Sequence, residues 1–192
     1  MKSLLLLPLL AISLLTSCGS FFSHESFVNR SNYKQIYKTY ENKTAQQSID
    51  TSKTKIVINI ATQRMIVSQG PTVLIDTPCT TGRLGKRTPL GTFKLYDKKA
   101  KKRSTVYGTI YRNGRRVCGG HRFERCPGVR GTFVGSPLPY WQRLTSNGIG
   151  MHASNYVKRY PASGGCIRLQ PAYAKKIFYL TKNGTPVTVT NS

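Results

Sequence analysis

The residues best suited to chemistry are a histidine and a cysteine fourteen positions apart, His152 and Cys166. A thiolate is the strongest side-chain nucleophile, and a nearby imidazole can take up the thiol proton. Such a pairing can lower the pKa of a thiol from about 8.5 to roughly 3.5–7.5. Gly164 and Gly165 precede the cysteine and let backbone N–H groups point at a reacting carbonyl oxygen. The set predicts acyl transfer, with Cys166 as the nucleophile and His152 as the base.

Three sequence blocks accompany this pair. Residues 79–93 read CTTGRLGKRTPLGTF, residues 139–152 read PYWQRLTSNGIGMH, and the cysteine stands in SGGCIR at 163–168. Over residues 54–190 the chain resembles the L,D-transpeptidases, the YkuD-type enzymes that cross-link peptidoglycan. The family usually reads Ser-His-Gly-Cys, and Gly164 occupies its histidine position here. His152 is therefore the only base candidate in the motif.

The resemblance implies a reaction in two steps. Cys166 would attack the amide of a donor stem peptide, release the terminal D-alanine and form a thioester, which an acceptor amine then resolves to a cross-link. It also implies acylation of Cys166 by carbapenems, and no metal or organic cofactor. With another acceptor, the same thioester gives an L,D-carboxypeptidase or amidase, or attaches or releases an outer-membrane protein at peptidoglycan. The sequence leaves the acceptor open.

Backbone groups are expected to complete the site. The acidic residues all lie far from the motif in sequence, so a carbonyl of Ala153 or Ser154 is expected to orient the imidazole. Amides around Gly165 and Cys166 are expected to form the oxyanion hole. Ser163 is expected to fix the loop through a bond from its side chain to the backbone.

Three further side chains are candidates for substrate binding. Arg168 would bind a substrate carboxylate or brace the cysteine loop, and Tyr140 and Trp141 would line the donor cleft or pack in the core. Thr88 and Phe93 are interpreted as scaffold. The sequence does not decide between these alternatives.

The N-terminus has the features of an export signal. Residues 1–17 combine an early lysine with an apolar run too short to span a bilayer, which indicates a signal peptide. Leu15-Thr16-Ser17-Cys18 resembles a lipobox, so Cys18 is the expected lipidation site. Gly19 follows, not an aspartate, which by the enterobacterial sorting rule implies the outer membrane. We expect an exported, lipid-anchored envelope protein in which residues 18–53 form a lipidated N-terminus and flexible tether.

The composition is strongly basic. The chain carries 30 Lys and Arg residues against 6 Asp and Glu residues, a formal net charge of +24 at pH 7. Such a charge favours anionic partners, which for an exported protein are envelope polymers and the carboxylates of peptidoglycan stems. Nucleic acid is excluded by the export signal and by the lack of a recognition helix or zinc-finger spacing. The cationic run at 98–103 is interpreted as a solvated loop or a docking site.

Two of the remaining cysteines, Cys118 and Cys126, are eight residues apart. An exported compartment permits a disulfide between them. Free thiols are a second possibility, and a metal site with His121 is a third, although it lacks a fourth ligand. Cys79 is interpreted as a small buried hydrophobe.

The pattern of the chain predicts a mainly β fold. Apolar β-branched runs predict strands near 56–60, 65–67, 73–75, 92–96 and 186–190, and Asn113-Gly114 predicts a hairpin between 106–112 and 115–118. One helix is predicted over 171–182, with Pro171 in its first turn and Gly184 after its end. The resemblance implies a β-sandwich with this C-terminal helix packed near the cysteine loop.

Overall fold

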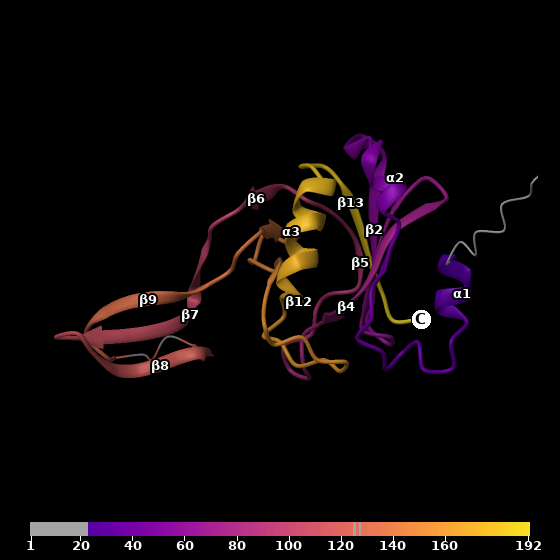
Figure 1. Ribbon diagram of the computed structural model, residues 1–192. Helices are drawn as coiled ribbons and strands as arrows, with labels where there is room; N and C mark the ends of the chain where they lie inside the picture. The colour runs from indigo at the N-terminus through magenta and orange to yellow at the C-terminus, as the bar shows by residue number, and fades with distance from the viewer. Residues whose placement is uncertain (1–22, 125, 127) are drawn as a thin grey trace, which may run out of the picture.

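The computed structural model describes residues 23–124, 126 and 128–192 (Figure 1). The predicted signal peptide at 1–17 and Cys18 lie outside these residues. The helical elements are α1 (His24–Val28), α2 (Lys43–Gln47), the 3-10 turn η1 (Thr51–Lys53) and α3 (Pro171–Leu180). The strands are β1 (Tyr40–Glu41), β2 (Thr54–Asn59), β3 (Arg64–Gln69), β4 (Thr72–Thr80), β5 (Gly91–Lys94), β6 (Asp97–Lys99), β7 (Arg103–Arg112), β8 (Arg115–Glu124), β9 (Thr132–Pro137), β10 (Trp141–Arg143), β11 (Gly150–Ala153), β12 (Ile167–Leu169) and β13 (Pro186–Thr190).

Ten strands form one continuous sheet that folds over on itself. Its order is β5-β13-β2-β3-β4-β12-β11-β10-β6, with β1 paired to β4 outside this path. The long strand β4 pairs with β3 up to Pro78 and with β12 at Cys79 and Thr80. Because β4 belongs to both halves, the sheet bends there into two layers. The mainly β prediction, with one C-terminal helix, is confirmed.

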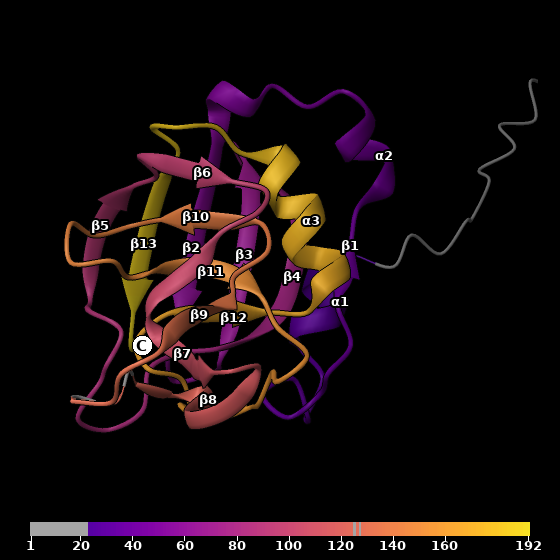
Figure 2. The same cartoon turned by 90° about the vertical axis from the view of Figure 1, so that its left-hand side faces the viewer.

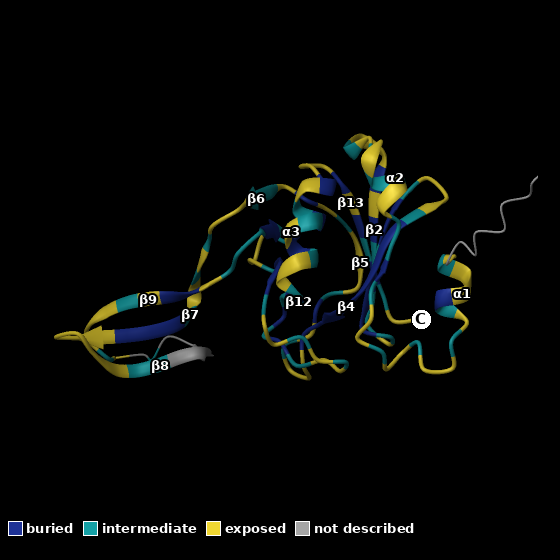
Figure 3. Cartoon of the chain, viewed as in Figure 1, coloured by how far each residue is buried: buried dark blue, intermediate teal, exposed yellow. Residues whose placement is uncertain are grey.

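One apolar core joins the two halves of the sheet with α3. Strand β2 alternates between buried and more exposed residues, and Ile56 and Ile58 point inward at 1% and 0% exposure. The same core contains Met151 and Ile167, from the two short strands that follow the bend, and Ile177 of α3. Figure 3 shows buried residues along β2, β4 and β13. Apart from the predicted hairpin at 106–118, the predicted strands correspond to β2, β3, β4, β5 and β13 of this sheet, where alternation is clearest.

The two ends of helix α3 are stabilised in different ways. Pro171 stands in its first turn, where its missing N–H is not needed. At the other end the Lys98 ammonium donates to the carbonyl oxygens of Phe178 and Thr181, which are left unpaired by the end of the helix. The Lys98 side chain is therefore packed against the end of α3 and does not belong to a solvated loop. Its partial burial lowers its pKa to about 8.

Strands β7, β8 and β9 form a separate three-stranded sheet, here called the arm. The arm projects from the sandwich in Figure 1 and toward the viewer in Figure 2. Asn113 and Gly114 connect β7 to β8 with φ of 49° and 72°, which confirms the predicted hairpin. A disulfide joins Cys118 of β8 to Cys126, so the structure shows the first of the three alternatives. Ile110 of β7 is 1% exposed.

The N-terminal segment, residues 23–53, differs from the expected flexible tether. Phe27 is buried, and Tyr40 pairs with Asp76 of β4 as part of β1. The hydroxyl of Thr39 lies 2.9 Å from that of Thr77. The described part of the expected tether is therefore docked against the sheet. Within the described residues, no helix is long and apolar enough to span a membrane.

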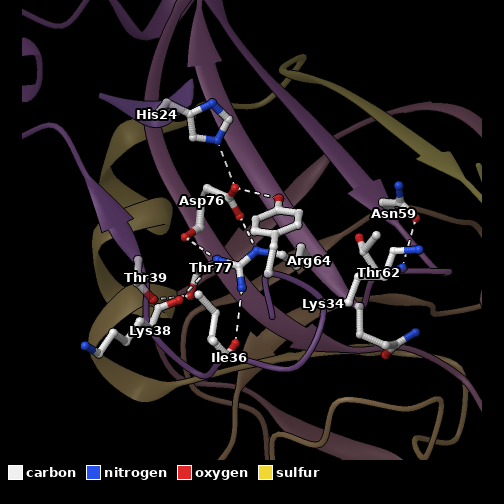
Figure 4. A network of polar contacts seen from close by, with 12 residues as sticks. His24, Lys34, Ile36, Lys38, Thr39, Asn59, Thr62, Arg64, Asp76 and Thr77 are labelled. Atoms are coloured by element: carbon white, nitrogen blue, oxygen red, sulfur yellow. Dashed lines mark hydrogen bonds and ion pairs between the residues drawn. The ribbon is translucent and has the colours of Figure 1, made fainter. Parts of the chain in front are cut away.

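The docking depends on a buried ion pair inside the sheet (Figure 4). Arg64 Nε lies 2.6 Å from Asp76 Oδ1, and both side chains have 0% exposure. His24 and Tyr33 of the N-terminal segment lie 2.9 and 2.7 Å from the other carboxylate oxygen. The Arg64 guanidinium also donates to the carbonyl oxygen of Lys38 at 3.1 Å. The segment therefore completes the hydrogen bonding of this buried ion pair, which local sequence pattern does not reveal.

Candidate functional site

His152 lies on β11, where all four residues are buried. Its Nδ1 lies 2.8 Å from the carbonyl oxygen of Ala153, which agrees with the expected backbone orienting group. A carbonyl oxygen only accepts, so Nδ1 carries the hydrogen and Nε2 presents a lone pair. Burial lowers the pKa of His152 to about 4, against the effect of the Ala153 carbonyl, and the charge of Arg168 lowers it further.

Cys166 stands directly before β12, which is parallel to β11 and next to it in the sheet. His152 is paired with Arg168, two residues beyond Cys166. The topology therefore brings the loop that ends at Cys166 next to the strand that carries His152. The Cys166 Sγ lies 3.9 Å from the carbonyl oxygen of Gly148.

The pair rests in its neutral form. Burial raises the pKa of the Cys166 thiol, and the Gly150 amide and the charge of Arg168 only partly oppose this effect. The thiol therefore keeps its proton at neutral pH. The imidazole of His152 is neutral, with its hydrogen on Nδ1 and no hydrogen on Nε2. This differs from the lowered thiol pKa that pairing with histidine suggested, because burial disfavours both charged forms.

The loop before Cys166 is fixed by its own serine. The Ser163 hydroxyl donates to the Cys166 carbonyl oxygen at 2.5 Å and accepts from the Gly165 N–H at 3.1 Å. This agrees with the expected bond from Ser163 to the backbone. It also corrects the expected oxyanion role of the Gly165 amide, because that donor is used within the loop. Gly165 has a φ of +117°, a region that favours glycine.

The segment after β4 holds the same loop from the other side. The Thr88 hydroxyl donates to the Gly165 carbonyl oxygen at 2.7 Å and accepts from the Gly82 N–H at 2.9 Å. Thr88 is 2% exposed, and Gly82 forms a parallel bridge with Ser163. Thr88 is thus a direct support of the cysteine loop. Its place in the 79–93 block was the signal that pointed to it.

The candidate substrate-binding aromatic residues pack inside the fold. Trp141 is 2% exposed, and its ring centroid lies 6.4 Å from that of His152. A side chain on Gly150 would meet Trp141, since a Cβ there would lie 2.8 Å from its ring. The Tyr140 ring lies 5.8 Å from that of Phe178 on α3. Trp141 is therefore not a wall of a substrate cleft, and Tyr140 contacts the helix.

Tyr107, which lies near the loop, carried no signal in the sequence, whereas Arg168 was a predicted candidate. Tyr107 of the arm lies against Gly164, and its hydroxyl lies 3.2 Å from the Lys86 Nζ. Arg168 acts on both His152 and Cys166 through its charge. Among the residues that the structure describes, no three His, Cys, Asp or Glu side chains form a group that could hold a metal ion.

Comparison with known proteins identifies the architecture. A family model described as the L,D-transpeptidase catalytic domain matches residues 53–189. A comparison with curated protein sequences returned no match.

Several solved structures are similar to this chain. An L,D-transpeptidase from Stackebrandtia nassauensis is 21% identical, with a TM-score of 0.54 over 74% of this chain and 57% of that one. An L,D-transpeptidase from Mycobacterium smegmatis is 22% identical, with a TM-score of 0.54 over 71% and 58%. L,D-transpeptidase 3 from Mycobacterium tuberculosis, in complex with a faropenem-derived adduct, is 20% identical, with a TM-score of 0.53 over 72% and 60%. This chain spans less than two thirds of the length of these proteins, and the likeness is one of fold.

Proposed function

Because the chain belongs to the L,D-transpeptidase catalytic domain family, we propose that it is a peptidoglycan L,D-transpeptidase with Cys166 as its nucleophile and His152 as its base. The observation that supports this most directly is the pairing of β11 with β12. It sets the loop that ends at Cys166 beside the strand that carries His152, and because Nδ1 of His152 is turned to the Ala153 carbonyl oxygen, Nε2 is left to accept a proton.

The neutral resting pair determines how the first step proceeds. As Sγ of Cys166 forms its bond to the carbonyl carbon of a donor stem peptide, the thiol proton passes to Nε2 of His152. The C–N bond then breaks, and the same proton goes to the departing D-alanine nitrogen, leaving a thioester. The Cys166 amide is the oxyanion donor that we propose, in place of that of Gly165. No metal or organic cofactor takes part.

The second step repeats the proton transfers in the opposite direction. An acceptor amine, such as that of a diaminopimelate residue, attacks the thioester carbon and gives its proton to Nε2 of His152. The C–S bond breaks, Sγ of Cys166 recovers that proton, and a cross-link remains. Arg168 would bind a stem carboxylate or brace the loop, and its position in the sheet next to His152 permits either role.

The direct test is intact-mass spectrometry of residues 23–192 incubated with a disaccharide-tetrapeptide. This range keeps the N-terminal segment, which the structure shows to be docked. A thioester adduct followed by a cross-linked dimer supports the proposal, and Cys166→Ala and His152→Ala should give neither. Tripeptide and D-alanine without dimer would indicate an L,D-carboxypeptidase, whereas no adduct would contradict the thioester mechanism.

We also propose that the protein is exported through residues 1–17 and anchored to the outer membrane through lipidated Cys18. Four residues lie between Cys18 and Ser23, the first residue that the structure describes, and the five residue steps from one to the other span at most about 18 Å. The catalytic domain would therefore lie close to the membrane. Incorporation of labelled palmitate should disappear in Cys18→Ala, and the variant should leave the membrane fraction.

Anionic envelope polymers are the partner that we propose for the arm. Arg112, Arg115 and Arg116 are exposed around its hairpin, in a chain with a net charge of +24. Electrostatic attraction of this kind weakens with salt. Binding to anionic wall polymer should fall with ionic strength and fall further in Arg115→Gln/Arg116→Gln, whereas equal binding by the variant would contradict the assignment.

A further inference from the structure

The arm touches the cysteine loop at Gly164, two residues before the proposed nucleophile Cys166. A Cβ built on Gly164 would lie 2.5 Å from the Tyr107 hydroxyl oxygen, 2.9 Å from Cζ and 3.2 Å from Cε2. The phenol of Tyr107 therefore fills the space that a side chain at position 164 would occupy.

The backbone conformation at position 164 does not require a glycine. Unlike Gly165, Gly164 is not among the residues with positive φ, so its conformation is open to any residue. What excludes a side chain is the close approach of Tyr107. The identity of residue 164 and the presence of the arm are thus connected by direct contact.

Tyr107 is itself held in place by two groups. Its N–H donates to the Ser104 hydroxyl at 2.9 Å, and its own hydroxyl oxygen lies 3.2 Å from the Lys86 ammonium nitrogen. Lys86 belongs to the segment that supports the loop, and its carbonyl oxygen lies 3.6 Å from the position of a Cβ on Gly165. Tyr107 therefore bridges the cysteine loop and the segment at 82–88.

We propose that Tyr107 is a positioning residue for Cys166. Its phenol fills the space beside Gly164 and holds the cysteine loop against the segment at 82–88. Part of the support of the nucleophile thus comes from the arm. The inference rests on the proposed function for its catalytic consequence, but the contact itself does not depend on it. Displacement of the arm then loosens the loop that carries the thiol.

The experiment uses the full chain and two reactions of Cys166. Acylation by a carbapenem, followed by mass spectrometry, requires the proposed catalytic site. Alkylation by iodoacetamide, followed by peptide mapping, requires only an accessible thiol. A wild type that is alkylated but not acylated would count against the proposed function, and the arm contact would still be tested by alkylation.

The variants distinguish the effect of the Tyr107 ring from the effect of its hydroxyl. Tyr107→Ala should slow acylation on the order of tenfold or more, since small displacements of reacting groups have large effects on rate. Tyr107→Phe, which keeps the ring, should retain most of the activity. Tyr111→Ala, in an exposed tyrosine of the same strand, is the matched control and should behave as the wild type.

A double-variant cycle gives the decisive result. Gly164→His should slow acylation because its side chain meets the phenol, and Gly164→His/Tyr107→Ala should recover at least about fivefold over Gly164→His. The pH profile of alkylation should also move to lower pH in Tyr107→Ala, as water reaches the thiol. The proposal would be overturned if Tyr107→Ala kept the acylation and alkylation profiles of the wild type. It would also be overturned if the effects of Gly164→His and Tyr107→Ala on acylation simply added.

Discussion

Thr88→Val tests whether one buried hydroxyl holds the cysteine loop in place. The substitution keeps the shape of the side chain and removes two hydrogen bonds, one to the Gly165 carbonyl oxygen and one from the Gly82 N–H. Thr88 is 2% exposed, so water does not replace the hydroxyl. An unsatisfied buried group typically costs about 1–3 kcal/mol, and the two together should lower the free energy of unfolding by about 2–6 kcal/mol.

The same variant should slow the chemistry beyond its effect on stability. With the Gly165 carbonyl released, the loop moves, and a misplacement of about 1 Å can reduce a rate on the order of 100-fold. Urea titration gives the free energy of unfolding, and carbapenem acylation of Cys166, measured under conditions where the protein is fully folded, gives the rate. Thr88→Ser should restore both, and Thr92→Val, at an exposed threonine, should change neither. Wild-type stability or an unchanged acylation rate in Thr88→Val would refute the reasoning.

Three further predictions address charge and cross-linking. Lowering the pH from 6.5 toward 4 should decrease the free energy of unfolding by up to about 3 kcal/mol, because His152 binds a proton in the unfolded chain but not in the folded one, where its pKa is about 4. Urea titrations should show a smaller loss in His152→Gln, and an equal loss in that variant would contradict the prediction. Asp76→Asn should destabilise the fold by about 3–5 kcal/mol, because it leaves the Arg64 charge buried without its carboxylate partner. Trypsin should then cut first in the N-terminal segment, and first cleavage elsewhere would argue against docking through this ion pair. Replacing Cys118 and Cys126 by serine should destabilise the arm by about 2 kcal/mol, with faster hydrogen exchange in β7 but not in β2; uniform exchange would show that the arm does not open separately.

Local pattern predicted the elements whose causes are local. The Asn113-Gly114 hairpin needs positive φ at two adjacent residues, which these residue types adopt readily. The helix α3 has Pro171 in its first turn, and Gly184, with a φ of +89°, follows its end. Strands β2, β3 and β13 carry clear β-branched runs. These elements would be recognised in almost any context.

The elements around the site escaped the same reasoning. Strands β10, β11 and β12 have only three or four residues each, too few for alternation to show. The N-terminal segment was interpreted as a tether because it is polar, and the buried pair that binds it lies on β3 and β4. Similarly, Lys98 appeared to be part of a solvated run, although its partners are on α3. Each of these outcomes depends on contacts between distant parts of the chain.

The candidate site was predictable in its reacting groups and less so in its supports. His152 and Cys166 were identified by type and spacing, and the orienting carbonyl of Ala153 followed from the absence of nearby acids. The contact of Tyr107 with Gly164 had no sequence signature, since it joins residues 57 positions apart. Trp141 has a residue type that often lines substrate clefts, but here it is buried beside His152.

The position of β13 also determines when the chain can fold. This strand, the last in the sequence, lies between β5 and β2 and pairs in parallel with β2 along Val187–Thr190. The connection between β5 and β2 therefore forms only after residues 186–190 have been synthesised. Pairing over so long a sequence separation is also slow. The pairing of β5 and β2 with the same strand is therefore among the last steps by which the larger sheet is completed.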